Sequence, residues 1–426
     1  MSDPLKPRAP MPRRTIIAFA LPFLLAACGK ETAQHSTAVV RDSAGIAIVE
    51  NPTAATAPEV VVDSLPVLTI GASSKGPDYD FGEVRAAARF RSGQIAVADG
   101  KSSVIRIYDS AGTYLRQVGR KGQGPGEFQE IGLLWTTPED SLLVYDLVSR
   151  RLSTFDPSGA FAHQADLAKQ GFLQPMGRLD NGVIVAIGFN FVQESFPSGN
   201  ATSRPPQPVL LIPADSTPTD TLGSFPGIEM YAVNVTFGGR TFPNPMTVQF
   251  GHLTSVAGRG GSIYVGDNAR YEIAVYSRDK KLVRLIRATA PEVPVTQPMR
   301  DAQQARNLEQ VAANQERIPA PLRDQVEGWI KTARYSERLP PYQQIRLDPD
   351  GNLWVQHYGM PDGPQHHTVF DSTGAVRARL VLPAGMELLE LGSDYILGKG
   401  EDADGLPYVR LYRSPMLTQE VASRRD

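Results

Sequence analysis

Three aspartates recur at one position of a repeated pattern and are the first candidates for chemistry. Each ends a short apolar run and stands nine residues before an aromatic residue; they are Asp99, Asp146 and Asp267. A ring of such carboxylates around an axis would bind a cation or a polar ligand. Alternatively, each side chain caps the turn that follows it, because aspartate accepts backbone N–H bonds two residues on. Recurrence in several repeats is what a structural role predicts, so we expect caps.

Histidines are the second set of candidates, because neutral imidazole is a common zinc ligand. His252 and His357 lie on or beside predicted strands, and His366–His367 falls on a predicted loop. No His-x-x-x-His pair or flanking carboxylate pattern accompanies them, and no Gly-x-Ser-x-Gly motif occurs. The sequence therefore predicts no catalytic residue, no metal and no cofactor. It leaves these two histidines and the three aspartates as weak candidate metal ligands.

The chemistry of the single cysteine follows from its position. Residues 1–14 contain four basic residues, and the apolar run 16–27 is too short to span a bilayer core of about 30 Å. This pattern predicts a signal peptide over 1–27. The run ends in Leu25-Ala26-Ala27-Cys28-Gly29, which resembles the bacterial lipobox. The resemblance implies diacylglycerol on Cys28 and cleavage before it; an ordinary signal peptide with an incidental cysteine is the alternative.

A lipid on Cys28 would place the protein in the cell envelope, anchored to a membrane outside the cytoplasm through the tether 28–38. Gly29 rather than aspartate after the cysteine favours the outer membrane, if the cell has one. The 43 basic and 45 acidic residues nearly balance. Nucleic acid is therefore not an expected partner.

Short apolar strands and tight turns repeat along the mature chain. Asp-Ser-Ala-Gly at 109–112 and Asp-Pro-Ser-Gly at 156–159 follow the aromatic residues, and a further turn precedes each copy. Each repeat therefore reads as strand a, turn, strand b, loop, strand c, turn, strand d. Four antiparallel strands of this kind form a propeller blade.

The stretch 120–128, Arg-Lys-Gly-Gln-Gly-Pro-Gly-Glu-Phe, resembles the linker between blades of NHL-type propellers. An echo of it occurs at 71–81. The chain thus resembles the NHL-like six-bladed β-propellers of bacterial lipoproteins over residues 60–414, most closely in the first two blades. The resemblance implies an all-β, six-bladed β-propeller preceded by a lipoprotein signal peptide. It implies no single function, because propellers host ligand binding, lyases and lactonases alike.

We expect a propeller over 58–414 between an N-terminal hairpin, 39–57, and a C-terminal tail, 415–426. The expected blades are 81–119, 128–169, 171–224, 249–288, 341–382 and 386–414. The last has room for only three strands, so a closing strand at 66–71 should complete it and remove a free edge. The third blade is irregular, and a count of seven stays open.

The longest connections all belong to the b–c loops and d–a linkers, which share one face of a propeller. They are 190–206, 225–248, the insertion 289–340, 358–366 and 398–407. The insertion reads as two helices, because 299–316 lacks Gly and Pro and a second apolar stripe follows Pro321.

Function concentrates in elaborated loops on a rigid scaffold, so this face is the predicted binding face. Within the insertion we predict ligand contacts from Trp329, Tyr335 and Arg338. The predicted function is an anchored binding or scaffold protein for a protein, peptide or glycan. The alternative is a metal-dependent propeller hydrolase or lyase, lactonase-like or amidating-lyase-like.

Overall fold

The structure is a computed structural model that describes residues 38–71, 76–189, 201–213, 219–313, 315, 318–360 and 363–414. The predicted signal peptide, Cys28, all but the last residue of the tether and the C-terminal tail lie outside these ranges. Within them, short strands dominate, and only two α-helices occur, α1 (Gln297–Ala313) and α2 (Arg323–Lys331).

Six four-stranded antiparallel units make up most of the described chain, and each has the strand order of a blade. Blade 1 contains β5 (Val84–Arg89), β6 (Ile95–Asp99), β7 (Val104–Tyr108) and β8 (Tyr114–Val118). Blade 2 contains β11 (Ile131–Thr136), β12 (Leu142–Asp146), β13 (Arg151–Phe155) and β14 (Phe161–Asp166). Blade 3 contains β15 (Phe172–Leu179), β16 (Ile184–Phe189), β17 (Pro206–Ile212) and β18 (Asp220–Pro226).

Blade 4 contains β21 (Thr254–Gly260), β22 (Ser262–Asp267), β23 (Glu272–Ser277) and β24 (Leu282–Ala288). Blade 5 contains β27 (Gln344–Leu347), β28 (Leu353–Gln356), β29 (Gln365–Phe370) and β30 (Val376–Leu382). Blade 6 contains β31 (Glu387–Leu391), β32 (Tyr395–Glu401) and β33 (Pro407–Arg413), with β4 (Leu68–Gly71) as its outer strand. His366 and His367 lie in β29, so their expected place on a loop is wrong: β29 begins at Gln365 and both histidines pair with β30.

The N-terminal segment follows the outer edges of three blades. The hairpin of β1 (Val39–Ser43) and β2 (Ile46–Asn51) adds to blade 4, where β2 runs parallel to β24. After η1 (Ala54–Thr56), β3 (Glu59–Val61) runs parallel to β30 of blade 5. Then β4 pairs antiparallel with β33 of blade 6. The segment that supplies the outer strand of blade 6 thus also covers the outer edges of blades 4 and 5. Without it, the backbone N–H and C=O groups of those edges would be exposed and unpaired.

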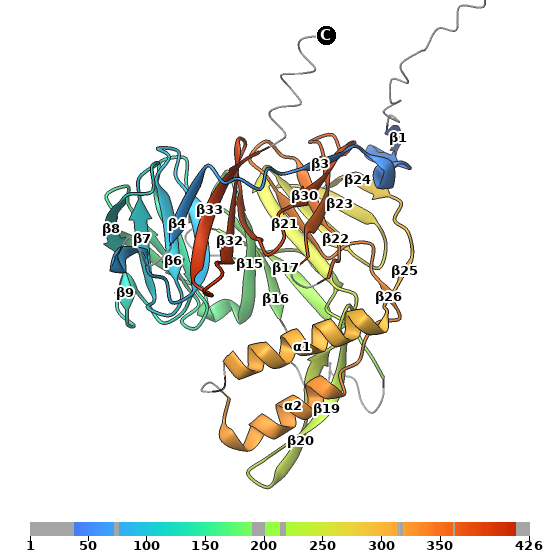
Figure 1. The fold of residues 1–426 in the computed structure, drawn as a ribbon. Coiled ribbons are helices and arrows are strands. Elements are labelled where there is room, and N and C mark those ends of the chain that lie inside the picture. The colour runs from blue at the N-terminus through green and yellow to red at the C-terminus, as the bar shows by residue number, and fades with distance from the viewer. Residues whose placement is uncertain are drawn as a thin grey trace, which may run out of the picture. The chain divides into compact units, whose positions relative to one another are not determined.

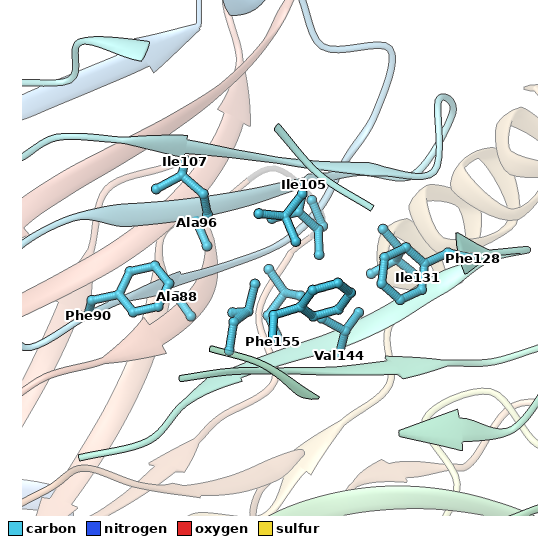
Figure 2. Close-up of a cluster of buried hydrophobic side chains, with 13 residues drawn as sticks. Ala88, Phe90, Ala96, Ile105, Ile107, Phe128, Ile131, Val144 and Phe155 are labelled. Carbon is cyan, nitrogen blue, oxygen red and sulfur yellow. The ribbon is translucent and has the colours of Figure 1, made fainter. Parts of the chain in front are cut away.

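Apolar side chains fill the seams between neighbouring blades rather than one central core. Figure 2 shows the seam of blades 1 and 2, where Ile105 and Ile107 belong to one apolar cluster with Phe128, Ile131 and Phe155. The linker between these blades contains two short strands, β9 (Arg120–Lys121) and β10 (Glu127–Phe128). Gly119 there has φ +71°, and a Cβ would lie 2.3 Å from the Phe128 ring, so glycine is required.

Two elaborations project from the same side of the blades (Figure 1). One is the hairpin of β19 (Met230–Phe237) and β20 (Arg240–Thr247), within a linker for which no strands were expected. The other is the helical insertion, framed by β25 (Val293–Pro294) and β26 (Arg338–Leu339), with η7 (Ala320–Leu322) before α2. Gln325 of α2 bonds both backbone groups of Thr236 in β19. The remaining 3-10 turns are η3 (Pro77–Tyr79) and η4 (Ala168–Gln170).

Candidate functional site

A pocket of about 570 Å³ lies where the insertion returns to blade 4. Its lining comes from the b–c loops of blades 3 and 4, at Thr202 and Ala269, from both sides of the β19–β20 hairpin up to the entry of β21, and from the two ends of the insertion, 290–292 and 334–341. The side chains that carry charge or a ring nitrogen are Glu229, His252, Glu292, Arg334, Glu337 and Arg338. Volumes of this size are typical of small-molecule and peptide sites.

Tyr335 is fixed in the pocket wall from several sides. Its backbone pairs with Gln249 in an isolated parallel bridge, and its hydroxyl donates to the Arg300 carbonyl at 3.2 Å. Its ring lies 6.1 Å from that of Phe250. Burial raises the pKa of Tyr335 above its ordinary value, so the phenol stays protonated at neutral pH. This aromatic wall is rigid before any ligand arrives.

Phe250 holds a backbone conformation that bulky residues rarely adopt. Its φ is +54°, at the turn closed by the Gly251 N–H to Val248 carbonyl bond of 3.0 Å. The ring contacts both Tyr335 and Tyr358. Strain of this kind costs of order 1–3 kcal/mol and persists where surrounding contacts enforce it. The strained turn positions the next element of the site, His252.

His252 and Glu229 form a dyad in the pocket wall. The imidazole Nδ1 lies 3.0 Å from Glu229 Oε2, and the same oxygen accepts the His252 backbone N–H at 3.1 Å. Backbone bonds between the two segments fix the pair further. With Nδ1–H donating to the carboxylate, Nε2 keeps its lone pair and can accept a proton or a hydrogen bond.

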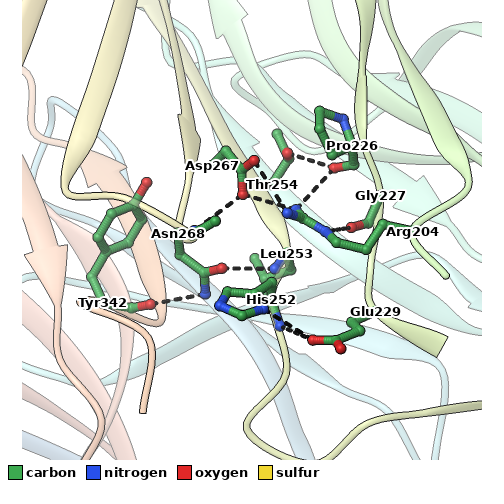
Figure 3. Close-up of polar contacts among 11 residues, drawn as sticks. Arg204, Pro226, Gly227, Glu229, His252, Leu253, Thr254, Asp267, Asn268 and Tyr342 are labelled. Carbon is green, nitrogen blue, oxygen red and sulfur yellow. Dashed lines mark hydrogen bonds and ion pairs between the residues drawn. The ribbon is translucent and has the colours of Figure 1, made fainter. Parts of the chain in front are cut away.

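Near the dyad, an ion pair joins blade 3 to blade 4 (Figure 3). Arg204 donates to both oxygens of Asp267, at 2.8 and 3.2 Å, and to the carbonyls of Pro226 and Gly227. Such a bidentate pair fixes both the position and the plane of the guanidinium. It braces the chain next to Thr202 and Ala269, which line the pocket.

The three aspartates of the repeat do not share one role. Asp99 accepts the N–H groups of Gly82, Glu83 and Lys101, and Asp146 accepts four backbone N–H groups. Both therefore tie the entry of an inner strand to the b–c turn of the same blade. Asp267 accepts the Ala269 N–H, two residues on, at 3.1 Å, so it caps its turn as predicted. Its other described partner is Arg204 rather than the entry of the inner strand.

In blade 4 the neighbouring asparagine ties the inner strand instead. Asn268 Oδ1 accepts the Leu253 N–H at 2.8 Å, and its Nδ2 donates to the Tyr342 carbonyl at 3.0 Å. Asn268 is fully buried. Its amide group can both accept and donate, so it links blade 4 to the entry of blade 5 and leaves Asp267 available to Arg204.

The other sequence candidates divide between the pocket and the scaffold. Tyr335, Arg338 and His252 line the pocket, whereas Trp329 lies on α2 and is not among its lining residues. His357 Nε2 lies 2.8 Å from the Thr368 hydroxyl, and its Nδ1 lies 3.2 Å from the Pro341 carbonyl. Burial lowers the pKa of His357. No group of three or more His, Cys, Asp or Glu side chains within the described ranges could hold a metal ion.

Arg204 and Glu229 were missed in the sequence, since each is a single charged residue in an irregular linker. Their only signal is membership of the elongated connections 190–206 and 225–248. Their partners, Asp267 and His252, are distant in sequence and adjacent only in the fold.

Comparisons with known proteins agree with the strand topology. A family model described as a 6-bladed beta-propeller matches residues 82–172, which span blades 1 and 2 and enter blade 3. No curated protein matches the chain. No helix among the described residues is long and apolar enough to cross a membrane.

Solved structures also resemble the chain at low sequence identity. An exported protein from Bacteroides fragilis is 9% identical, with 86% of this chain and 99% of that chain covered and a TM-score of 0.45. A gluconolactonase from Xanthomonas campestris is 12% identical, with 83% and 96% covered and a TM-score of 0.41. A virginiamycin B lyase from Staphylococcus aureus is 9% identical, with 81% and 98% covered and a TM-score of 0.38.

The six four-stranded units of the described residues, and the match of residues 82–172 to a 6-bladed beta-propeller model, support a mostly-β fold of the six-bladed propeller class. Its particular features are the hairpin β19–β20, the helical insertion and the pocket that lies at the base of the insertion.

Proposed function

We propose that this protein is an extracytoplasmic binding protein, tethered to a membrane through a lipid on Cys28, whose ligand site is the pocket at the base of the insertion. The observation that carries the proposal is the origin of the pocket lining. Nearly all of its residues come from long connections and strand entries of the elaborated side. A rigid scaffold whose longest connections surround one pocket is typical of a binding protein.

The lining suits a peptide or glycan better than an apolar ligand. Arg338 and Glu292 are paired across β25 and β26, and both side chains are largely exposed. Tyr335 supplies a fixed aromatic surface, and Arg334 is stacked at 4.7 Å on the Tyr231 ring. Charged groups of both signs beside an aromatic wall would satisfy the backbone of a peptide or the hydroxyls of a sugar.

Site-specific photo-cross-linking in the native cell envelope tests the site. A photoreactive phenylalanine analogue placed at 335 or 338 should capture a ligand, because both positions line the pocket. Leu115, an exposed residue of β8 in blade 1, provides the matched control position. Capture from 115 but not from 335 or 338 would contradict the proposed site.

Cys28→Ala tests the anchor separately. We expect the variant to lack lipid, with processed protein in the soluble fraction, because the thioether needs the cysteine sulfur. Mass spectrometry of the N-terminal peptide and fractionation with a high-salt wash measure this. A variant that stays membrane-bound after the wash would overturn the lipid anchor while leaving the pocket proposal intact.

The His252–Glu229 dyad favours one second candidate, a propeller hydrolase or lyase. The carboxylate orients the imidazole so that Nε2 can act as a general base towards water or a C–H bond of a pocket-bound substrate. The donor set in the described residues does not fit a metal centre, so this candidate depends on the dyad alone. Turnover of a panel of lactones and esters, lost about 100-fold or more in His252→Gln, would establish it. A wild-type protein inert towards the panel would favour binding alone.

A further inference from the structure

Away from the pocket, two cationic or polar side chains of blade 5 face blade 6. Register pairs Arg346 of β27 with Trp354, and Trp354 with Val369 of β29. His367 lies two residues before Val369 and therefore shares that face. Trp354 packs in the apolar cluster of the blade 5–6 seam, so Arg346 and His367 flank this seam. The rings of Trp354 and His367 lie 5.9 Å apart.

Both side chains have donor groups without acceptors. The Arg346 Nε has no hydrogen-bond partner, and the guanidinium makes one long contact of 3.5 Å to the Leu389 carbonyl. His367 is only 1% exposed, and neither ring nitrogen makes a hydrogen bond of normal geometry to a described residue. Burial, with the charge of Arg346, lowers the pKa of His367 to about 3. The imidazole is therefore neutral and has one N–H to donate.

The nearby carboxylates are already engaged. Glu387 pairs with Lys399 Nζ at 3.1 Å. Glu390 accepts the Arg89 backbone N–H at 2.7 Å and the Tyr395 hydroxyl at 2.8 Å. Burial raises the pKa of Glu390 to about 7, so it is a weak counter-ion at neutral pH. Glu387 acts on Arg346 electrostatically, but no carboxylate of the described residues forms an ion pair with it.

Other cations of the inner strands strengthen the positive potential here. Arg259 of β21 and Arg89 of β5 both act electrostatically on Glu390, so guanidinium groups from blades 1, 4 and 5 converge on the Leu389–Glu390 segment. Arg89 is partly neutralised by Asp394, at 3.4 Å. Inner strands of neighbouring blades lie side by side, as β5 and β31 do. An excess of cation is therefore gathered at one end of the inner strands.

We propose that the blade 5–6 seam beside Leu389 is a binding site for a small oxyanion, held by Arg346 Nε–H and the N–H of His367. Two N–H donors of a guanidinium and an imidazole match the oxygens of a phosphate or carboxylate. The site is separate from the pocket at the base of the insertion and does not depend on the function proposed for it.

Calorimetric titration of the full protein in detergent, at pH 7 and constant ionic strength, tests the site with inorganic phosphate and with acetate. We expect one phosphate per chain for the wild type and binding about tenfold weaker or more for Arg346→Met, which loses every donor of that side chain. Acetate distinguishes a carboxylate site from a phosphate site. Arg116→Met is the matched control, because Arg116 Nε also lacks a partner but lies on β8 of blade 1.

Stability supplies the second readout. Without phosphate, Arg346→Met should unfold at the same temperature as the wild type or a higher one, since an uncompensated charge is removed. Phosphate should raise the midpoint of the wild type and of Arg116→Met, but not that of His367→Leu. The proposal would be overturned if the wild type bound neither phosphate nor acetate, or if Arg116→Met weakened phosphate binding as much as Arg346→Met. A lower unfolding temperature of Arg346→Met than of the wild type in anion-free buffer would also overturn it.

Discussion

Blades 2 and 4 carry an aspartate at the same position of the repeat and use it differently. In blade 2, Asp146 is 2% exposed and accepts four backbone N–H groups of its own blade. In blade 4, Asp267 pairs with Arg204 of the β16–β17 loop of blade 3, and the buried Asn268 bonds the entry of the inner strand. Among the three blades that carry this aspartate, blade 4, which borders the pocket, is the one in which the aspartate does not bond the entry of the inner strand.

The difference shows how a repeat can gain a site without losing its fold. An asparagine one residue further on provides both an acceptor and a donor, so the inner strand remains tied to the blade. The aspartate is then free to hold a guanidinium from an elaborated loop. The bond to the inner strand is thus made by Asn268, one residue later, and the Asp267 carboxylate instead holds Arg204 beside the pocket.

The largest effect should come from Asp146→Ala. The variant leaves four backbone N–H groups without their acceptor in a buried turn, and we expect a loss of about 3 kcal/mol in the free energy of unfolding. Urea denaturation measures it. Asp156→Ala, in an exposed hairpin turn, is the control and should cost about 1 kcal/mol or less. Equal losses for both variants would show that burial of the cap is unimportant.

Glu390 is a third kind of carboxylate, with one backbone N–H and one hydroxyl as its donors. Burial raises its pKa in the folded state to about 7, above the ordinary value of 4.5. Its stabilising contribution is therefore complete below pH 4.5 and is lost as the pH rises to about 7. Relative to Glu390→Gln, the wild type should lose about 2 kcal/mol of stability between pH 4.5 and 8, allowing for solvent in the site.

Unfolding free energies at several pH values measure this difference. Asp156→Asn is the contrasting variant: hydrogen bonds from the Ser158 hydroxyl and the Ala160 N–H lower the pKa of Asp156, so the wild type should gain nothing over it on acidification. A pH-independent difference between the wild type and Glu390→Gln would show that Glu390 stays ionised.

Asn268→Ala tests whether the asparagine has taken over the tie in blade 4. It removes the acceptor of Leu253 N–H and the donor to the Tyr342 carbonyl, and we expect a loss of about 1.5 kcal/mol. Asn181→Ala, in an exposed turn with one bond to Val183, should cost less than about 0.5 kcal/mol. If Asn268→Ala is as mild as this control, Asp267 must hold the inner strand after all.

The sequence was informative wherever the repeat is local. Short apolar strands, Asp-x-x-Gly turns and the Gly-Pro-Gly linker depend on neighbouring residues, and six four-stranded units lie where these signals predict them. Strand β3 was missed because three residues carry too little pattern. The hairpin β19–β20 was missed because Pro243 and Pro245 in β20 argue against a strand; both are tolerated since β20 is an edge.

The site was harder to predict for a physical reason. Polar contacts such as Arg204–Asp267 and Glu229–His252 join residues 63 and 23 positions apart, and no periodicity marks them. Tyr335 and Arg338 could be proposed from the sequence because the long insertion that contains them is recognisable there. Trp329 was chosen for residue type alone, and its position on α2 depends on packing that a single sequence does not specify.

Asp267→Ala should have the smallest effect on stability and a larger one on ligand capture. Arg204 keeps its bonds to the carbonyls of Pro226 and Gly227, so the loss should stay below about 1 kcal/mol. The chain beside Thr202 and Ala269 loses its brace, however, and cross-linking from position 335 should fall several-fold, because recognition needs a preorganised wall. Asp267→Asn, which retains the acceptor for Ala269 N–H, should lie between the variant and the wild type. An unfolding loss equal to that of Asp146→Ala, with capture unchanged, would mean that the two aspartates do the same structural work and that blade 4 does not differ from blade 2 in the way described.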